Sequence, residues 1–409
     1  MLTPETPYRH NAVLLYSHDG FGLGHLKRNV TIAKRTVYDF PGSKALLITG
    51  HSSLPGSPLP YGIDFIKLPS IIKAKTGVWQ PRSLPIENER LCQIRSAMIL
   101  KAAEYFVPSI FLVDYTPTGV WGELVETLEM LKSRPEPPTI ILGLRDILDA
   151  PEVTCKIWET EGNYEAIRNY YDKIFIYGRQ EIYDTAFHYG LTDDLSEKIL
   201  YTDYLCSDEP CKPQDQIREE LQVKKENLVL VTAGGGYDAY PMMRLAIKAL
   251  GILMRNLSFE AIFITGPLMK AEHRESLQKQ AKNLPIRILR SVEGTLNYMS
   301  AANLIVTMGS YNTLMDAVRL QKSVIVIPRE GPSAEQKIRA QLLSQMGLIS
   351  ALKSPALLSP FELAESMLKN LTQPQTPPIF LAMNGLTKAV SQIGNFFESN
   401  KQLQPLSKI

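Results

Sequence analysis

Short apolar segments alternate with helix-like segments along the whole chain, and this alternation restricts the possible folds most strongly. The apolar segments are continuous, which is typical of parallel strands that are buried on both faces. In the first half we expect strands at 12–17, 44–49, 64–68, 110–113, 139–143 and 173–177. In the second half we expect strands at 228–232, 260–265, 286–289, 304–307 and 323–327. The pattern predicts an α/β protein with two Rossmann-like, doubly wound parallel sheets.

The length of the chain and a break in this pattern indicate two domains. The chain has 409 residues, whereas single hydrophobic cores stop growing at about 250–300 residues. Apolar periodicity stops in a polar, proline-containing stretch at 207–215. We therefore expect an N-terminal domain at 1–205, a linker at 206–224, a C-terminal domain at 225–375, and a final helix within 376–409 that is free to pack back on the N-terminal domain.

The composition excludes several classes of protein. A hydrophobic content of 44% and a charged content of 21% are those of a soluble globular protein. The formal net charge of +2 predicts no nucleic-acid partner. No apolar stretch approaches the length of a membrane span, and residues 1–10 do not form a signal region, so we expect a cytoplasmic location. The cysteines lack zinc-site spacing and are interpreted as reduced thiols: Cys92, Cys155, Cys206 and Cys211.

One stretch near the C-terminal third has the features of an anion-binding site. The expected strand at 304–307 is followed by Gly309, and small polar residues then begin a helix. A glycine turn at a helix N-terminus directs backbone N–H groups and the positive end of the helix dipole at one spot, which suits a diphosphate. Asp316 lies about one turn into this helix, where it could reach ribose hydroxyls.

Two further glycine clusters follow the first strand of each half. Their spacing differs from the Gly-x-Gly-x-x-Gly fingerprint of nicotinamide-binding domains: the clusters are Gly20, Gly22 and Gly24, and Gly234 to Gly236. Tight strand-to-helix turns without a ligand remain an alternative for either cluster. Ligands of open parallel sheets bind at the carboxyl ends of the strands. Two domains that face each other would therefore place all three glycine turns around one cleft.

These stretches together resemble the two-domain GT-B glycosyltransferases. The pattern is most similar to family 28, which includes the transferase that adds N-acetylglucosamine to the lipid-linked peptidoglycan precursor. The N-terminal half most resembles a little-characterised branch of predicted bacterial glycosyltransferases. The matching stretches cover most of the chain in order: 17–29, 170–178, 234–236, 265–267, 308–313 and 328–340.

The resemblance implies that the C-terminal domain binds a nucleotide sugar, most commonly a UDP-sugar, and that the N-terminal domain binds the acceptor. It assigns the diphosphate to the Gly309 turn, the ribose to Asp316, where the family more often has glutamate, and the sugar to Glu335 and Gln336. The segment 289–292 matches the one that surrounds the uracil. The implied donor site comprises Gly235, Gly236, Gly266, Arg290, Val292, Gly309, Ser310, Asn312, Thr313, Asp316, Glu335 and Gln336.

Sugar transfer with inversion needs a base for the acceptor hydroxyl and charge stabilisation for the leaving diphosphate. His25 matches the histidine that ends the family's first glycine loop, and His18 and Asp19 are alternative bases at the same strand end. Asp114 follows another expected strand and could orient the histidine, although a turn residue is an equally good interpretation.

The predicted site also includes the N-terminal glycine loop, and it lacks a metal-binding motif. Gly22 and Gly24 would form a loop for the acceptor or a phosphate. No two aspartates are separated by one residue, so the Asp-x-Asp motif of metal-dependent transferases is missing. We expect a metal-independent reaction without a cofactor.

The sequence is also compatible with two other functions, and one segment has more than one interpretation. A sugar-nucleotide 2-epimerase of the same fold would act on the donor alone, and a non-catalytic subunit would bind the nucleotide sugar without turnover. The segment 71–82 mixes apolar and basic residues. It suits an acceptor-binding loop, a peripheral contact with the inner face of a membrane, or a solvated loop with a buried tryptophan. The acceptor, the sugar and the oligomeric state are not encoded in a recognisable motif.

Overall fold

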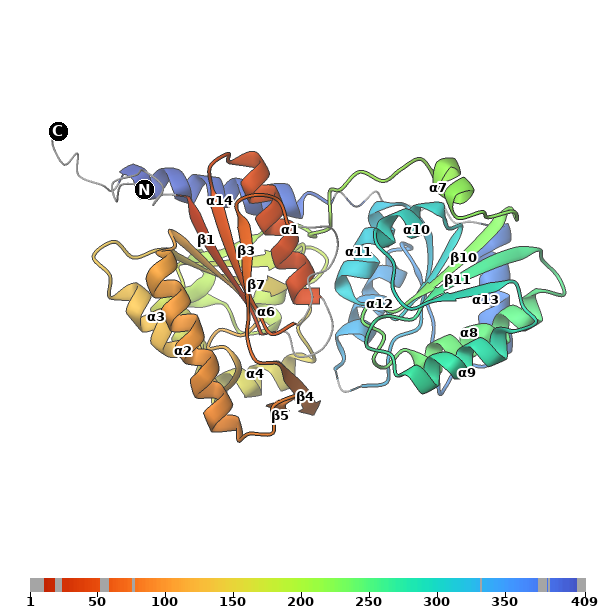
Figure 1. Cartoon of the computed structure of the whole chain (residues 1–409), viewed down its shortest axis with the longest axis horizontal. Coiled ribbons are helices and arrows are strands. Elements are labelled where there is room, and N and C mark those ends of the chain that lie inside the picture. The colour runs from red at the N-terminus through yellow and green to blue at the C-terminus, as the bar shows by residue number, and fades with distance from the viewer. Residues whose placement is uncertain are drawn as a thin grey trace. The chain divides into compact units, whose positions relative to one another are not determined.

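The computed structural model describes residues 11–18, 24–51, 59–75, 78–331, 333–373, 381 and 383–402. It divides into two compact units. Unit 1 comprises Met1–Leu205 and Asn384–Ile409, and unit 2 comprises Cys206–Met383. Each unit contains a parallel sheet with helices packed on it (Figure 1), so the predicted α/β class with two doubly wound sheets is confirmed.

Unit 1 is built on a seven-stranded sheet in the order β3-β2-β1-β6-β7-β8-β9, in which all neighbours are parallel. Its strands are β1 (Ala12–Ser17), β2 (Lys44–Thr49), β3 (Ile63–Lys67), β6 (Ile110–Asp114), β7 (Thr139–Arg145), β8 (Lys173–Tyr177) and β9 (Ile199–Tyr201). The strand order reverses between β1 and β6. Such a topological switch point is where open parallel sheets bind ligands.

The helices of unit 1 include one from the end of the described chain. They are α1 (Gly24–Asp39), α2 (Asn88–Phe106), η1 (Val120–Gly122), α3 (Val125–Lys132), α4 (Pro151–Thr160), α5 (Asn163–Tyr170), α6 (Thr185–His188), η2 (Asp193–Lys198) and α14 (Gly385–Gln402). Helix α14 packs on α1, where the rings of Phe397 and Phe40 meet edge to face at 5.6 Å. A side chain at Gly394 would collide with the Phe40 ring at 2.2 Å, so this glycine permits the close approach.

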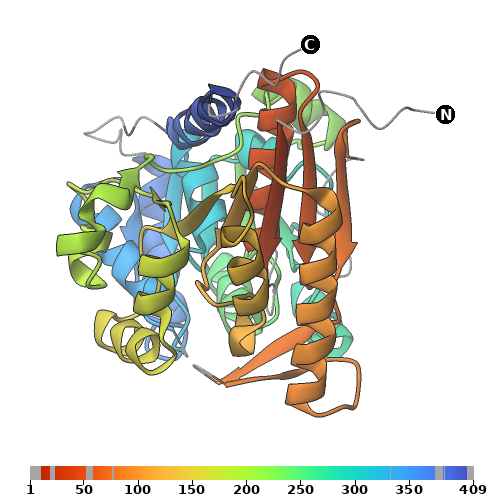
Figure 2. The same cartoon turned by 90° about the vertical axis from the view of Figure 1, so that its left-hand side faces the viewer.

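A separate antiparallel hairpin lies beside α2 in unit 1 (Figure 2). It consists of β4 (Ile71–Lys75) and β5 (Val78–Pro81). Ile71 is buried against Leu91 of α2 and Val120, and Trp79 packs on the same cluster. Two of the three interpretations of the segment 71–82 made it a loop, and that conformation is wrong for most of its length, because cross-strand pairing and this apolar cluster stabilise a hairpin.

Unit 2 is built on a six-stranded parallel sheet in the order β12-β11-β10-β13-β14-β15. Its strands are β10 (Asn227–Thr232), β11 (Phe259–Ile264), β12 (Ile286–Leu289), β13 (Leu304–Thr307), β14 (Ser323–Val326) and β15 (Ser350–Ala351). Its helices are α7 (Gln214–Glu220), α8 (Tyr240–Leu253), α9 (Ala271–Ala281), α10 (Thr295–Ala301), α11 (Tyr311–Arg319), α12 (Glu335–Gln345) and α13 (Pro360–Thr372). The switch point of this sheet lies between β10 and β13.

Every strand predicted from an apolar run is present, with its ends within two residues of the expected positions. The strands that the sequence did not predict are β4, β5, β9 and β15. The hairpin strands pair with each other outside the main sheet, and β9 and β15 are edge strands whose side chains are only partly buried. Such strands need no continuous apolar run, so the pattern used for buried strands does not detect them.

Candidate active site

The carboxyl ends of the central strands of unit 1 are level with one another at the switch point. Ser17, the last residue of β1, pairs with Asp114, the last residue of β6. His18 follows β1 directly, and His25 is the second residue of α1. The fold therefore brings His18, His25 and Asp114 to one edge of the sheet. Gly24 is the exposed first residue of α1, whereas Asp19 and Gly22 lie outside the described residues.

Three polar side chains meet at this edge. His25 Nδ1 lies 3.4 Å from Asp114 Oδ2. Arg28, one turn further along α1, donates from Nη2 to both carboxylate oxygens of Asp114 at 2.8 Å. The side chains of Arg28 and Asp114 are buried, while that of His25 is 13% exposed. Of these three groups, His25 is the one that solvent or a substrate reaches.

The carboxyl group of Asp114 is held in its charged form. Burial by itself raises the pKa of Asp114, but the Arg28 guanidinium and then His25 outweigh it and lower this pKa to about 2. Asp114 is therefore an anion at neutral pH. The sequence interpretation missed Arg28, although an arginine three residues after His25 and among the apolar positions of α1 was a usable signal.

Aromatic rings surround the imidazole of His25. The ring centroids of His18 and Tyr115 lie 4.8 Å and 5.6 Å from that of His25. Trp79 of the hairpin meets His18 edge to face at 5.1 Å, so the hairpin contributes a side chain to this cluster. Tyr115 has a φ of 83°, a left-handed conformation that residues other than glycine rarely adopt. Its N–H donates to Gly143 O at 2.9 Å, which helps to hold this conformation next to Asp114.

The corresponding edge of unit 2 is lined by glycine turns. Gly236 and Gly266 have φ angles of 82° and 86°, which glycine adopts without strain. A Cβ at Gly236 would lie 1.8 Å from Thr265 O, and one at Gly266 would lie 2.4 Å from Gly235 O. The turns after β10 and β11 therefore pack backbone against backbone, and side chains at Gly236 and Gly266 are excluded by this packing.

Helix α11 starts immediately after the third glycine turn. Gly309 has a φ of 85°, and Ser310 is the N-cap residue of the helix. The Ser310 hydroxyl donates to Thr313 Oγ1 at 3.0 Å and does not cap the backbone. A Cβ on Gly234 would lie 3.9 Å from Ser310 Oγ and 4.0 Å from Thr313 Oγ1. The turn after β10 thus lies beside the start of α11, where the helix dipole favours an anion.

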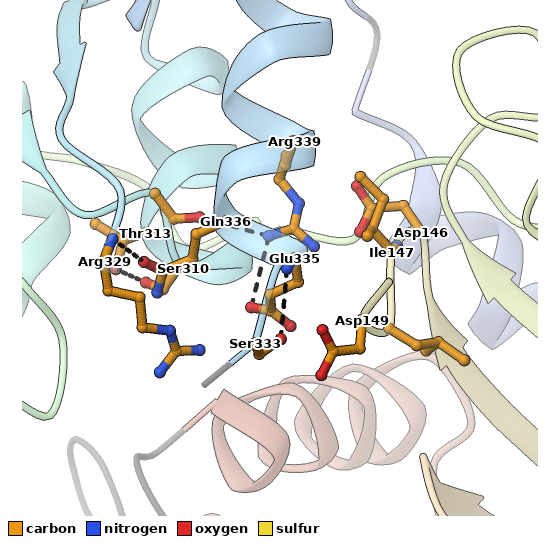
Figure 3. Close-up of polar contacts among 12 residues, drawn as sticks. Asp146, Ile147, Asp149, Ser310, Thr313, Arg329, Ser333, Glu335, Gln336 and Arg339 are labelled. Carbon is orange, nitrogen blue, oxygen red and sulfur yellow. Dashed lines mark hydrogen bonds and ion pairs between the residues drawn. The ribbon is translucent and has the colours of Figure 1, made fainter. Parts of the chain in front are cut away.

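Polar contacts connect the start of α12 to Arg329 and to the Gly309 turn (Figure 3). Gln336 Oε1 accepts a hydrogen bond from the Arg329 N–H at 3.3 Å. The carboxylate of Glu335 lies 3.7 Å from Arg339 Nη1, and this nitrogen also donates to Gly309 O at 3.4 Å. All three α12 side chains are buried. Arg339 therefore places a positive charge behind the Gly309 turn, a feature that the sequence interpretation did not assign to the site.

The remaining predicted donor residues are distributed along the same edge of the sheet. Asn312 is half-buried in the first turn of α11, and Asp316 is buried further along the helix. Arg290 is exposed and Val292 is half-buried, and both follow β12. Leu289, at the end of β12, pairs with Ile264 of β11, so these two residues follow a strand end that is level with its neighbour.

The described part of the chain has neither a cluster of metal-ligating side chains nor a membrane-spanning helix. Within it, no three His, Cys, Asp or Glu side chains are grouped so as to hold a metal ion. None of the helices described combines the length and the apolar content that crossing a membrane requires. The four cysteines are free thiols.

A comparison with protein families identifies the C-terminal half. Residues 228–392 match the model of the glycosyltransferase family 28 C-terminal domain. This range contains all of the donor residues that the sequence predicted. The predicted similarity to family 28 is thereby confirmed for this domain, whereas membership of the peptidoglycan branch is not.

Two curated relatives are named as uncharacterized glycosyltransferases. An uncharacterized glycosyltransferase of Methanopyrus kandleri is 27% identical over 156 residues, which are 38% of this chain and 41% of the relative. An uncharacterized glycosyltransferase of Methanosarcina acetivorans is 23% identical over 355 residues, which are 80% of this chain and 82% of the relative. The chain spans 41% and 36% of the length of the first two curated relatives that it matches.

Solved structures with a similar fold cover nearly the whole chain. A putative UDP-N-acetylglucosamine 2-epimerase from Listeria monocytogenes has a TM-score of 0.62 at 13% identity, with 98% of this chain and 99% of the other covered. MurG from Acinetobacter baumannii has a TM-score of 0.56 at 11% identity, with 94% and 99% covered. UGT2 from Phytolacca americana, in complex with UDP-2fluoro-glucose and pterostilbene, has a TM-score of 0.57 at 13% identity, with 95% and 94% covered. At these identities the likeness shows the fold alone, and the fold is GT-B as predicted.

Proposed function

We propose that this chain, whose residues 228–392 match the family 28 C-terminal domain, is a glycosyltransferase that moves a sugar from a nucleotide diphosphate sugar to an acceptor hydroxyl. The family domain and the names of the relatives support a glycosyltransferase. The main support for the proposal is the edge of the sheet in the matched domain where the strand order reverses. The glycine turns at Gly236, Gly266 and Gly309 and the start of α11 lie there.

The proposed donor site lies in unit 2. The diphosphate binds at the Gly309 turn and the first turn of α11, where the helix dipole and the Ser310 and Thr313 hydroxyls favour it. Asp316 is proposed to bind the ribose, Glu335 and Gln336 the sugar, and the segment with Arg290 and Val292 the base. A structural neighbour that was crystallised with UDP-2fluoro-glucose supports UDP as the nucleotide.

The proposed base is His25 of unit 1. It takes the proton of the acceptor hydroxyl while the hydroxyl oxygen forms a bond to the anomeric carbon and the bond to the diphosphate oxygen breaks. The diphosphate leaves with the electron pair, and the configuration at the anomeric carbon inverts. Asp114, an anion at neutral pH, stabilises the imidazolium that forms. The charge on the diphosphate is compensated by the α11 dipole and backbone groups, and we therefore propose a metal-independent reaction.

A sugar-nucleotide 2-epimerase is the second candidate. The fold of the Listeria monocytogenes protein, a putative UDP-N-acetylglucosamine 2-epimerase, is similar over both units. An epimerase would convert the nucleotide sugar without an acceptor, whereas a transferase would consume it only when a hydroxyl or water takes the sugar.

A thermal-shift panel followed by product analysis tests the proposal. Nucleotide sugars with different bases are added to the whole chain in EDTA and, separately, in Mg²⁺, because a ligand that binds the folded state raises Tm. Donors that raise Tm are then incubated alone and with alcohols, and products are identified by mass spectrometry and NMR. A new glycoside supports a transferase, and a C2 epimer formed from the donor alone supports the epimerase. The absence of any shift and any turnover contradicts both.

A further inference from the structure

Arg28 is a buried cation that contacts both groups of the proposed proton-transfer pair. Its Nη2 donates to Asp114 Oδ1 and Oδ2 at 2.8 Å, and the same nitrogen lies 3.2 Å from His25 Nδ1. Its guanidinium carbon lies 5.2 Å from the centroid of the Tyr177 ring. Packing and two hydrogen bonds therefore fix the position of Arg28 behind His25.

One nitrogen of His25 faces opposite charges at nearly equal distances. Nδ1 lies 3.2 Å from the Arg28 guanidinium and 3.4 Å from the Asp114 carboxylate. Among the described residues, His18 and Tyr115 have titratable rings that pack beside that of His25, with centroids at 4.8 Å and 5.6 Å. A cation disfavours a second proton on the imidazole and an anion favours it. The two charges are about equally close, and they act on Nδ1 in opposite directions.

The two contacts also compete for the proton on Nδ1. A guanidinium nitrogen can only donate, so Nδ1 accepts when it bonds to Arg28 and the ring proton is then on Nε2. When Nδ1 carries the proton it can donate to Asp114, and Nε2 then has the free lone pair that a base needs. The balance between Arg28 and Asp114 therefore decides which ring nitrogen can accept the acceptor's proton.

We infer that Arg28 is a positioning residue of the proposed reaction, which holds Asp114 against His25 and opposes the carboxylate charge at Nδ1. This inference rests on the proposed function in that His25 is taken to be the base. Loss of Arg28 leaves the carboxylate alone beside Nδ1, so the imidazolium form gains. Loss of the Asp114 charge leaves the guanidinium alone, so the imidazolium form loses.

The test compares Arg28→Gln, Asp114→Asn and the double variant with the wild-type chain. Long-range ¹H–¹⁵N NMR spectra of the histidine side chains report the tautomer and the protonated fraction directly, and His25→Gln identifies the resonances of His25. We expect Arg28→Gln to move the acid limb of the His25 titration, and of the pH–rate profile, upward by about one pH unit or more, since an opposite charge within 4–6 Å shifts titration by about 1–3 units. Asp114→Asn should move both downward, and the double variant should lie near the wild type.

Two further variants separate this role from a structural one. Arg35→Gln removes a charge from the same helix, where Arg35 pairs with Asp39 at 2.7 Å, and should leave the His25 titration unchanged. Arg28→Lys keeps the charge and should restore the wild-type protonated fraction, and it remains informative if Arg28→Gln does not fold. Shifts of the same sign in Arg28→Gln and Asp114→Asn, or no shift in either, would overturn the inference.

The NMR readout does not depend on turnover. If opposite shifts are seen but no nucleotide sugar is bound or turned over, the charge balance stands and the proposed function fails. If a glycoside is formed but the His25 titration is unaffected by Arg28→Gln, the proposed function stands and the inference about Arg28 fails.

Discussion

The two units place very different groups at equivalent points of similar sheets. In both, the strand order reverses beside the first strand, and the carboxyl ends of the central strands are level. Unit 1 fills this edge with side chains, an imidazole backed by the buried Arg28–Asp114 ion pair. Unit 2 lines it with glycine turns, hydroxyls and the start of α11. The topology provides the place, and the residues after each strand decide whether it suits proton transfer or anion binding.

The largest effect that the comparison predicts is on turnover through unit 1. His25→Ala should lower kcat by about 10²–10⁴-fold, the usual contribution of a general base, while the Tm shift caused by the donor is unchanged. The matched control is His188→Ala on α6, where the ring stacks on Tyr183 at 4.4 Å. Turnover in the control should be normal. Near-normal turnover of His25→Ala would exclude His25 as the base.

The next effect concerns stability and the backbone of unit 2. Gly236→Ala introduces a Cβ 1.8 Å from Thr265 O at a φ of 82°, and we expect a loss of about 2–4 kcal/mol in the free energy of unfolding. Gly251→Ala is the control. Gly251 lies within helix α8, and a Cβ there would lie 4.0 Å from the Leu284 side chain, an ordinary van der Waals distance. Alanine should be neutral or stabilising there by up to about 1 kcal/mol. Urea unfolding measures both, and equal stability of the two variants would contradict the backbone packing.

The pH dependence of stability tests the ion pair of unit 1. The pKa of Asp114 is lowered from 3.8 to about 2 in the folded chain. Its contribution is therefore complete at pH values above 3.8 and is lost as the pH falls through about 2. The shift corresponds to about 2 kcal/mol of unfolding free energy. The free energy of unfolding is measured between pH 5 and pH 2 for the wild type and for Asp114→Asn, and this loss should appear in the wild type alone. Parallel plots of this free energy against pH would refute a stabilising Asp114 charge.

The smallest expected effect is on donor binding through unit 2. Asp316→Asn keeps the shape of the buried side chain but removes its charge, and we expect the donor KM to rise about tenfold, which is about 1.4 kcal/mol, with kcat little changed. Asp215→Asn on the surface of unit 2 is the control. If KM for the donor is the same in Asp316→Asn as in the wild type, Asp316 belongs to the structure of α11 rather than to the ribose site.

The buried strands and the glycine turns could be predicted from the sequence because each has a local cause. A continuous apolar run marks a strand covered on both faces, and β1, β2, β8, β12 and β13 begin and end as predicted. The start of α11 was likewise visible in the small residues after Gly309. The edge strands β9 and β15 and the hairpin β4–β5 lack this pattern. Pairing with a neighbouring strand stabilises them, and the hairpin also packs on the apolar cluster around Ile71.

The missing parts of the candidate site depend on tertiary contacts. Arg28 meets Asp114, which is far away in sequence, only because β1 and β6 are neighbours in the sheet. Trp79 reaches His18 only because the hairpin is anchored on α2. Arg339 reaches Gly309 O from α12, the helix that follows the neighbouring strand β14. The position of Arg28 among the apolar residues of α1 indicated a buried arginine, but the partners in these contacts have no fixed spacing along the chain and could not be named from the sequence.

Soaking a crystal of the whole chain with UDP is the sharpest test of diphosphate binding at the backbone edge of unit 2. Density for the diphosphate should appear at the Gly309 turn, within hydrogen-bond distance of backbone N–H groups in the first turn of α11. UDP bound at another place in the chain, with only solvent at the start of α11, would contradict it.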